Sequence, residues 1–207
     1  MDTPRRSIAH GVLWRAFPWD RAAPEGAPFS CRSVAPPHRQ NYGRFDLRGS
    51  PSVLYLAQSP AHALAEVLRG LKAHPDDPAR RHGIYPEDLL GPMGLPRAVV
   101  SVRLPPRVAD AVPDCCEGDV LARLGVRADE MCSRDRAVTQ AAARRIYQHP
   151  DSVPGFVWWS ALHGDWHAAV LFLDCVGMDE MEWGGPEVLT MDHPAVAEAA
   201  AALGLDV

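Results

Sequence analysis

The chain has 207 residues, of which 47% are hydrophobic and 23% charged, and its formal net charge is −5. This length and composition predict one globular domain with a single core. A negative net charge argues against direct nucleic-acid binding, because affinity for phosphate backbones requires clustered positive charge. The sequence has no run of about 18 apolar residues and no apolar N-terminal signal, so we expect a cytoplasmic protein without a membrane partner.

Two proline-rich segments, residues 20–40 and 74–97, predict long loops. Long loops in a compact domain often line pockets or contact partners, so both are candidate partner surfaces. Almost all basic residues are arginine, Lys72 being the single lysine, and alanine, proline and glycine are abundant. This bias is typical of a GC-rich bacterial genome.

Between the two predicted loops, a turn, a strand and a helix follow one another. Glycine, serine and proline at 49–51 predict the turn, and the apolar run at 53–56 predicts a buried strand. Ser59 followed by Pro60 predicts a helix N-terminus, because the serine hydroxyl can accept from unpaired amides and proline is tolerated at the first helical position. We therefore expect a helix from Pro60 to about Lys72.

The predicted helix has an apolar face and a polar face. Three leucines share the first, and three polar residues mark the second: Leu64, Leu68 and Leu71 against His62, Arg69 and Lys72. Glu66 falls at the edge of the polar face, beside the small residues Ala63 and Gly70. Spacing alone leaves two interpretations open, a solvated helix carboxylate or a carboxylate that faces a pocket.

The remaining elements predict a mixed domain without repeats. Further strands are expected at residues 98–104, 156–159 and 168–173, and further helices at 137–147 and about 194–203. Because helices and loops separate the strands, their pairing must be non-local. The sequence therefore predicts a single α+β domain over residues 1–207.

The cysteines predict neither a disulfide framework nor a metal site. There are five, an odd number, and they are scattered: Cys31, Cys115, Cys116, Cys132 and Cys175. No paired C-x-x-C completes a zinc ligand set, and His163 and His167 lack the glutamate that follows the first histidine of a helical zinc motif. We expect reduced thiols and no metal.

Three motifs follow one another along the chain. Residues 43–67 combine a Gly-Arg-aromatic motif, a Leu-Tyr-Leu strand and a Ser-Pro-x-x-Ala-Leu-x-Glu helix start, Trp14-Arg15 lies upstream, and residues 155–160 read Gly-x-x-aromatic-x-Ser. Together they resemble the RES-domain family, bacterial toxins encoded beside Xre-type antitoxins. The resemblance spans about residues 11–175. It implies that the name-giving Arg, Glu and Ser are Arg15 or Arg44, Glu66 and Ser160.

The resemblance also implies a fold, an activity and a partner. RES proteins resemble ADP-ribosyltransferase toxins in fold and consume NAD+, some of them by phosphorolysis. It therefore implies a toxin enzyme similar to an NAD+ phosphorylase or glycohydrolase, which cleaves the nicotinamide glycosidic bond. NAD+ would be a substrate, joined by phosphate in the phosphorolytic case. A cognate Xre-type antitoxin would neutralise the toxin.

The candidate residues suit this chemistry. Cleavage passes through an oxocarbenium-like state that needs a nearby carboxylate, and Glu66 is the candidate. Planar arginine forks bind pyrophosphate, a role for Arg15 and Arg44. Tyr55 offers a ring face for nicotinamide or a hydroxyl for its ribose. Ser160 offers a hydrogen bond, since no G-x-S-x-G elbow marks it as a nucleophile. We thus expect Glu66, Arg44 and Ser160 to be catalytic, and Arg15, Arg44, Tyr55 and Ser160 to bind NAD+.

Alternatives remain open for these residues. Arg15 can bridge surface carboxylates, Tyr55 can be a core strand aromatic, and Ser160 can simply end a strand. Trp158 and Trp159 depart from the family pattern beside the serine, which leaves the acceptor open. Two other functions also remain, ADP-ribose transfer to a protein and a catalytically silent partner-binding module. The joint presence of all candidate residues disfavours the silent module.

Overall fold

The computed structural model describes residues 7–34, 43–47, 49, 51–71 and 83–207. Within these residues, seven strands form one antiparallel sheet in the order β4-β5-β2-β1-β3-β6, with β7 also paired to β3. The strands are β1 (Leu13–Pro18), β2 (Val53–Ala57), β3 (Arg97–Arg103), β4 (Gly155–Trp159), β5 (His167–Phe172), β6 (Glu182–Trp183) and β7 (Glu187–Val188).

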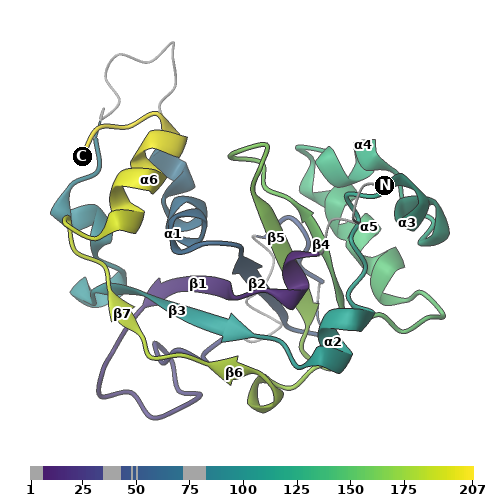
Figure 1. The fold of residues 1–207 in the computed structure, drawn as a ribbon, viewed down its shortest axis with the longest axis horizontal. Coiled ribbons are helices and arrows are strands. Elements are labelled where there is room, and N and C mark those ends of the chain that lie inside the picture. Colours follow the sequence, from purple (N-terminus) through teal and green to yellow (C-terminus); the bar gives the residue numbers. More distant parts are fainter. Residues whose placement is uncertain (1–6, 35–42, 48, 50, 72–82) are drawn as a thin grey trace, which may run out of the picture.

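Six α-helices surround the described part of the sheet. They are α1 (Pro60–Leu68), α2 (Pro106–Ala111), α3 (Gly118–Arg123), α4 (Ala128–Cys132), α5 (Arg136–Tyr147) and α6 (Pro194–Leu203). Short 3-10 turns are η1 (Ile8–His10), η3 (Arg69–Leu71), η4 (Pro86–Leu89), η5 (Pro92–Gly94) and η6 (Met178–Glu180). Figure 1 shows α1 and α6 together at one end, and α3, α4 and α5 grouped beside β4 and β5 at the other.

The structure confirms the predicted α+β class and its main elements. β2, β3, β4, β5, α5 and α6 agree with the predicted segments to within one residue at each end, and α1 with η3 covers 60–71. β1 was not predicted, because its mixed sequence shows no clear alternation and its extended form comes from six residue pairs with β3. The short helices α2, α3 and α4 were missed as well, since five or six residues carry little periodic signal.

The two predicted loops are described only in part. Residues 20–34 form turns, and residues 83–96 contain η4 and η5, whereas residues 35–40 and 74–82 lie outside the described residues. Among the helices of the described segments, none is long and apolar enough to span a bilayer.

The two faces of the sheet are covered differently. One face carries a large cluster that packs against α2 and η1 and includes Leu13, Leu54 and Leu171. A smaller cluster on the same face contains Phe17, Ala98 and Val100. On the other face, one cluster joins α1 to α6 and a separate cluster joins α5 to β4 and β5. Alternation along β2 turns Tyr55 to this second face, where its side chain stays 36% exposed. A space over β2 is thus left between the two helical groups.

One face of α1 differs from the prediction. Leu64 and Leu68 are buried and Arg69 is exposed, as expected. His62, which we expected on the solvated face, is 0% exposed. The ring of Trp166, from the turn between β4 and β5, stacks on it with centroids 4.8 Å apart. Helical periodicity classes histidine as polar, but it does not show which distant segment will cover that position.

Candidate functional site

A cleft of about 490 Å³ opens over β2, between α1, the loop 43–46 and the end of β4. All five predicted site residues line it: Arg15, Arg44, Tyr55, Glu66 and Ser160. They come from β1, the loop before β2, β2 itself, α1 and the position after β4. The fold therefore brings together side chains from segments up to 145 residues apart in sequence (160 − 15).

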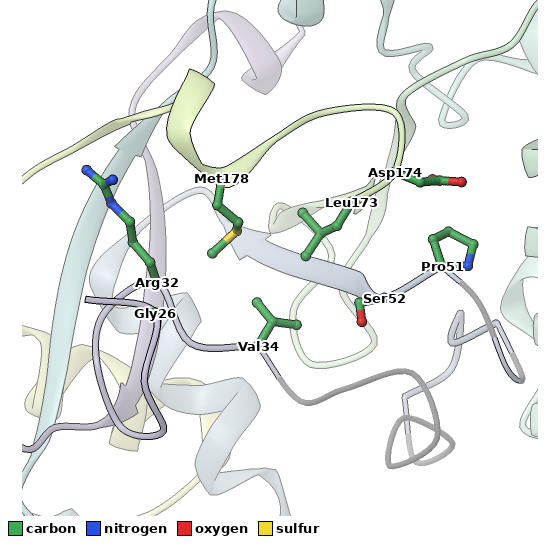
Figure 2. Close-up of a pocket in the computed structure, with 8 residues that line it drawn as sticks. All are labelled: Gly26, Arg32, Val34, Pro51, Ser52, Leu173, Asp174 and Met178. Atoms are coloured by element: carbon green, nitrogen blue, oxygen red, sulfur yellow. The ribbon is translucent and has the colours of Figure 1, made fainter. Parts of the chain in front are cut away.

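A second cavity, of about 400 Å³, lies near the start of β2 and the end of β5. Figure 2 shows the guanidinium of Arg32 and the carboxylate of Asp174 pointing away from its centre on opposite sides. Arg32 is already paired with Glu25 and lies over the ring of Trp183. Because its charged groups do not converge, this cavity is a weaker candidate than the cleft over β2.

Glu66 and Ser160 meet in a direct hydrogen bond. The Ser160 hydroxyl donates to Glu66 Oε1 over 2.7 Å, and it accepts the amide of Leu162 over 3.1 Å. Gly155 begins β4, the strand that ends just before Ser160, and a Cβ at Gly155 would overlap the carbonyl of Val170 in β5. The glycine and the serine of this motif therefore have separate structural reasons, close strand approach and a contact to the carboxylate.

Glu66 is held in its charged form. Its side chain is 35% exposed, and burial by itself raises its pKa. The contacts with His62 and Ser160 and the positive charge of Arg69 outweigh burial, so the pKa lies below the ordinary value of 4.5. At neutral pH, Glu66 is a carboxylate that can stabilise positive charge in the cleft.

Arg44 lies on a loop whose backbone is anchored to α5. Gln140 donates to the carbonyl of Gly43 over 3.1 Å, and the hydroxyl of Thr139 donates to the carbonyl of Arg44. Both anchoring side chains are buried. The guanidinium donates to the carbonyl of Met131, and burial lowers its pKa, although arginine stays charged in proteins.

Tyr55 is fixed by the same loop. Its hydroxyl donates to Asp46 over 2.8 Å and accepts the amide of Phe45 over 3.0 Å. Asp46, which is buried, also accepts the amide of Gly43 over 2.8 Å. Burial raises the pKa of Tyr55 well above 10, and the charge of Asp46 and the hydrogen bond to it raise it further. The hydroxyl therefore remains protonated and engaged, and the ring face is the part of Tyr55 that is free to meet a ligand.

Arg15 has partners that the sequence did not indicate. Its guanidinium donates to the carbonyl of Cys31 over 2.7 Å and also to the carbonyl of Ser33. Burial lowers its pKa to about 10, so it remains a cation at neutral pH. Strand alternation places Arg15 on the face of Leu13 and Phe17, and its side chain also lines the cleft. Arg15 thus ties the 19–34 segment to the wall of the cleft.

Two polar residues of α1 and η3, His62 and Arg69, line the cleft although the sequence predicted no role for them there. Arg69 lines the cleft one turn beyond Glu66, and its charge acts on both Glu66 and Arg44. His62 lines it one turn before Glu66. The available signal was helical spacing, since positions 62, 66 and 69 share one side of a helix. The assumption that polar helix residues face solvent hid this signal.

Metal ligation and thiol chemistry would depend on the histidine, cysteine and acidic side chains. Across the described ranges, no group of three or more His, Cys, Asp or Glu side chains is placed to hold a metal ion. The five cysteines are free thiols. Burial raises the pKa of Cys115 to about 12, which leaves its thiol protonated and unreactive at neutral pH.

Comparisons with known proteins bear on the fold and the family of the chain. A search of curated protein sequences gave no match. Among solved structures, the chain is similar to the crystal structure of the M. tuberculosis MbcT-MbcA toxin-antitoxin complex, with a TM-score of 0.55 and 16% sequence identity over 86% of this chain and 84% of the other. At that identity, the likeness concerns the fold. The family model of the RES domain matches residues 12–183, so the chain belongs to the RES domain family.

Proposed function

We propose that this protein is a toxin enzyme that consumes NAD+ by cleaving its nicotinamide glycosidic bond. The observation that carries the proposal is the ionised Glu66, held by Ser160 in a cleft that Arg15, Arg44 and Arg69 also line. A carboxylate stabilises developing positive charge on a ribose, and nearby cations suit a pyrophosphate. One cleft thus offers complementary groups to both parts of NAD+.

In the proposed reaction, the bond from the ribose C1′ to the nicotinamide nitrogen breaks, and its electron pair leaves with nicotinamide. Glu66 faces the oxocarbenium-like carbon, and Ser160 keeps the carboxylate in place. Arg44 and Arg69 hold the pyrophosphate, with Arg15 as a further candidate, and the ring of Tyr55 lies against the nicotinamide or its ribose. Water or phosphate then bonds to C1′ and gives up a proton.

We propose that an antitoxin protein, of the Xre type that the family resemblance implies, covers this cleft. The similar structure is described as a toxin-antitoxin complex, and the rim of the cleft here exposes Tyr55, Val67 and Trp159. Exposed apolar side chains that lie together on a surface are typical of a protein-interaction site. In this proposal the whole chain is one cytoplasmic RES-like domain.

Product analysis tests the activity. Purified protein is incubated with NAD+, with and without phosphate, and the products are identified by chromatography and mass spectrometry. Release of nicotinamide with ADP-ribose indicates hydrolysis, and a phosphorylated ADP-ribose indicates phosphorolysis. ADP-ribose attached to a protein would identify the alternative transferase function. An absence of nicotinamide under all these conditions would contradict NAD+ cleavage and favour a silent binding module.

Growth measurements test the toxin role. Expression of the protein alone should stop bacterial growth, and co-expression with the neighbouring gene product should restore it. Normal growth at high levels of soluble protein would count against the toxin proposal.

A further inference from the structure

His62 is a buried side chain that the proposed chemistry leaves without a role. It is 0% exposed, and within the described residues neither of its ring nitrogens has a partner at hydrogen-bond geometry. Burying an unpaired polar group is costly, so such a group calls for a specific explanation. An apolar side chain of similar size would fill this position without that cost.

The position of the ring is defined by Trp166 and Glu66. The His62 ring stacks on Trp166 with an interplanar angle of 26°. Its Nε2 lies 3.5 Å from Glu66 Oε1, which is too long for a strong hydrogen bond but close enough for an electrostatic contact. His62 precedes Glu66 by four residues, so one turn of α1 places both side chains on the same side.

Trp166 contacts both His62 and Ser160, the two residues that lie against the Glu66 carboxylate. Its ring supports His62, and its backbone carbonyl accepts the amide of Ser160 over 2.7 Å. Ser160 and His62 therefore both approach the same carboxylate oxygen, Oε1, and both are held by Trp166. Both contacts are made to Oε1, and neither is made to the second carboxylate oxygen, Oε2.

We propose that His62 is a positioning residue that, with Ser160, holds Oε1 of Glu66 and thereby directs Oε2 toward the bound substrate. The proposal rests on the function proposed above, and it assigns a role that the motif residues do not carry. An N–H at Nε2 is attracted to the carboxylate whether the imidazole is neutral or protonated. When substrate excludes water from the cleft, that contact becomes stronger.

Two substitutions separate positioning from packing. His62→Phe keeps a ring that can stack on Trp166 but removes both nitrogens, and His62→Gln keeps a donor. We expect His62→Phe to lower kcat about ten- to a hundredfold with little change in KM, since a small misplacement of a reacting group costs this much. His62→Gln should recover a large part of the loss. Equal kcat values for wild type and His62→Phe would overturn the proposal.

A second measurement does not depend on activity. The titration of the Glu66 carboxylate is followed by carbon-13 NMR, with Glu66→Gln used to assign its signal. In His62→Phe, the pKa of Glu66 should rise, because one of the contacts that lowers it is lost. An unchanged Glu66 titration in the Phe variant would show that His62 acts only as packing. Should that variant fail to fold, His62→Leu makes the same comparison.

His163→Phe is the matched control. The His163 ring also contacts Trp166, with centroids 5.3 Å apart, but the side chain is exposed and does not line the cleft. We expect neither kcat nor the Glu66 titration to change. If wild type releases no nicotinamide, the proposed function fails, while the titration still decides the role of His62.

Discussion

The two walls of the cleft are built in different ways. On one wall, Glu66 projects from a regular helix whose start is fixed locally, because the Ser59 hydroxyl accepts the amide of His62 and Pro60 opens the first turn. On the other wall, Arg44 lies on an irregular loop whose carbonyls are anchored by Thr139 and Gln140 of α5. The carboxylate is therefore placed by a helix that packs as a unit, and the arginine by single hydrogen bonds. Substitutions on the first wall should change chemistry, and those on the second should change binding and stability together.

The largest effect is expected from Glu66→Gln. An amide cannot stabilise an oxocarbenium-like state, so turnover should fall roughly a hundredfold, about 3 kcal/mol, with little change in NAD+ affinity. Nicotinamide release by wild type and variant at matched thermal stability measures this. Glu198→Gln, at an exposed position of α6, is the control. Comparable rates for wild type and Glu66→Gln would remove Glu66 from the mechanism.

Arg44→Lys should weaken NAD+ binding about tenfold, because an ammonium does not reproduce the planar fork of arginine. Calorimetric titration in the Glu66→Gln background separates binding from turnover. Arg136→Lys, at an exposed position of α5, controls for a general effect of the exchange. Equal NAD+ affinity with and without the Arg44→Lys exchange would give Arg44 a structural role only, through its contact with Met131.

Thr139→Val tests whether α5 holds the loop that carries Arg44 in place. Loss of the buried hydroxyl removes the hydrogen bond that it donates to the carbonyl of Arg44, which should destabilise the protein by about 1–3 kcal/mol. We expect weaker NAD+ binding with a nearly normal turnover number at saturation. Thr139→Ser should restore both stability and affinity. Denaturant unfolding measures the stability, and titration with NAD+ measures the affinity. A Thr139→Val protein with unchanged stability and affinity would show that the loop does not need the Thr139 hydroxyl.

Arg69→Gln should have a smaller effect, since this side chain is exposed and its charge is screened by salt. We expect KM for NAD+ to rise by roughly threefold at low ionic strength, with the difference shrinking as salt is added. Arg103→Gln, at an exposed position on β3, serves as the control. A KM that is unchanged at low salt would exclude Arg69 from phosphate binding.

The smallest effect on activity and stability is expected when the pH is varied above 4.5, the ordinary pKa of Glu66. Because the folded pKa lies below 4.5, Glu66 stays ionised above that value, and its charge favours both the native state and activity there. Both contributions decline as pH falls through the lowered folded pKa. The acid limb of the rate profile should therefore lie below pH 4.5 in wild type. An acid limb centred near neutral pH would assign the titration to another group.

Short-range sequence signals were enough to define the elements that carry the motifs. They predicted the helix that begins at Pro60 and the strands that hold Tyr55 and precede Ser160, because caps, proline positions and apolar runs act within a few residues. The same signals indicated that Glu66 lies at the border of a polar face. The family resemblance then identified which of the polar residues to consider together.

Long-range contacts, by contrast, set how those residues are used. The burial of His62 depends on Trp166, about a hundred residues away, and the engagement of Arg15 depends on the carbonyls of Cys31 and Ser33. The anchoring of Arg44 likewise depends on Thr139. Periodicity describes a single element and carries no information about its distant neighbours, whereas burial, hydrogen bonding and pKa are set by those neighbours.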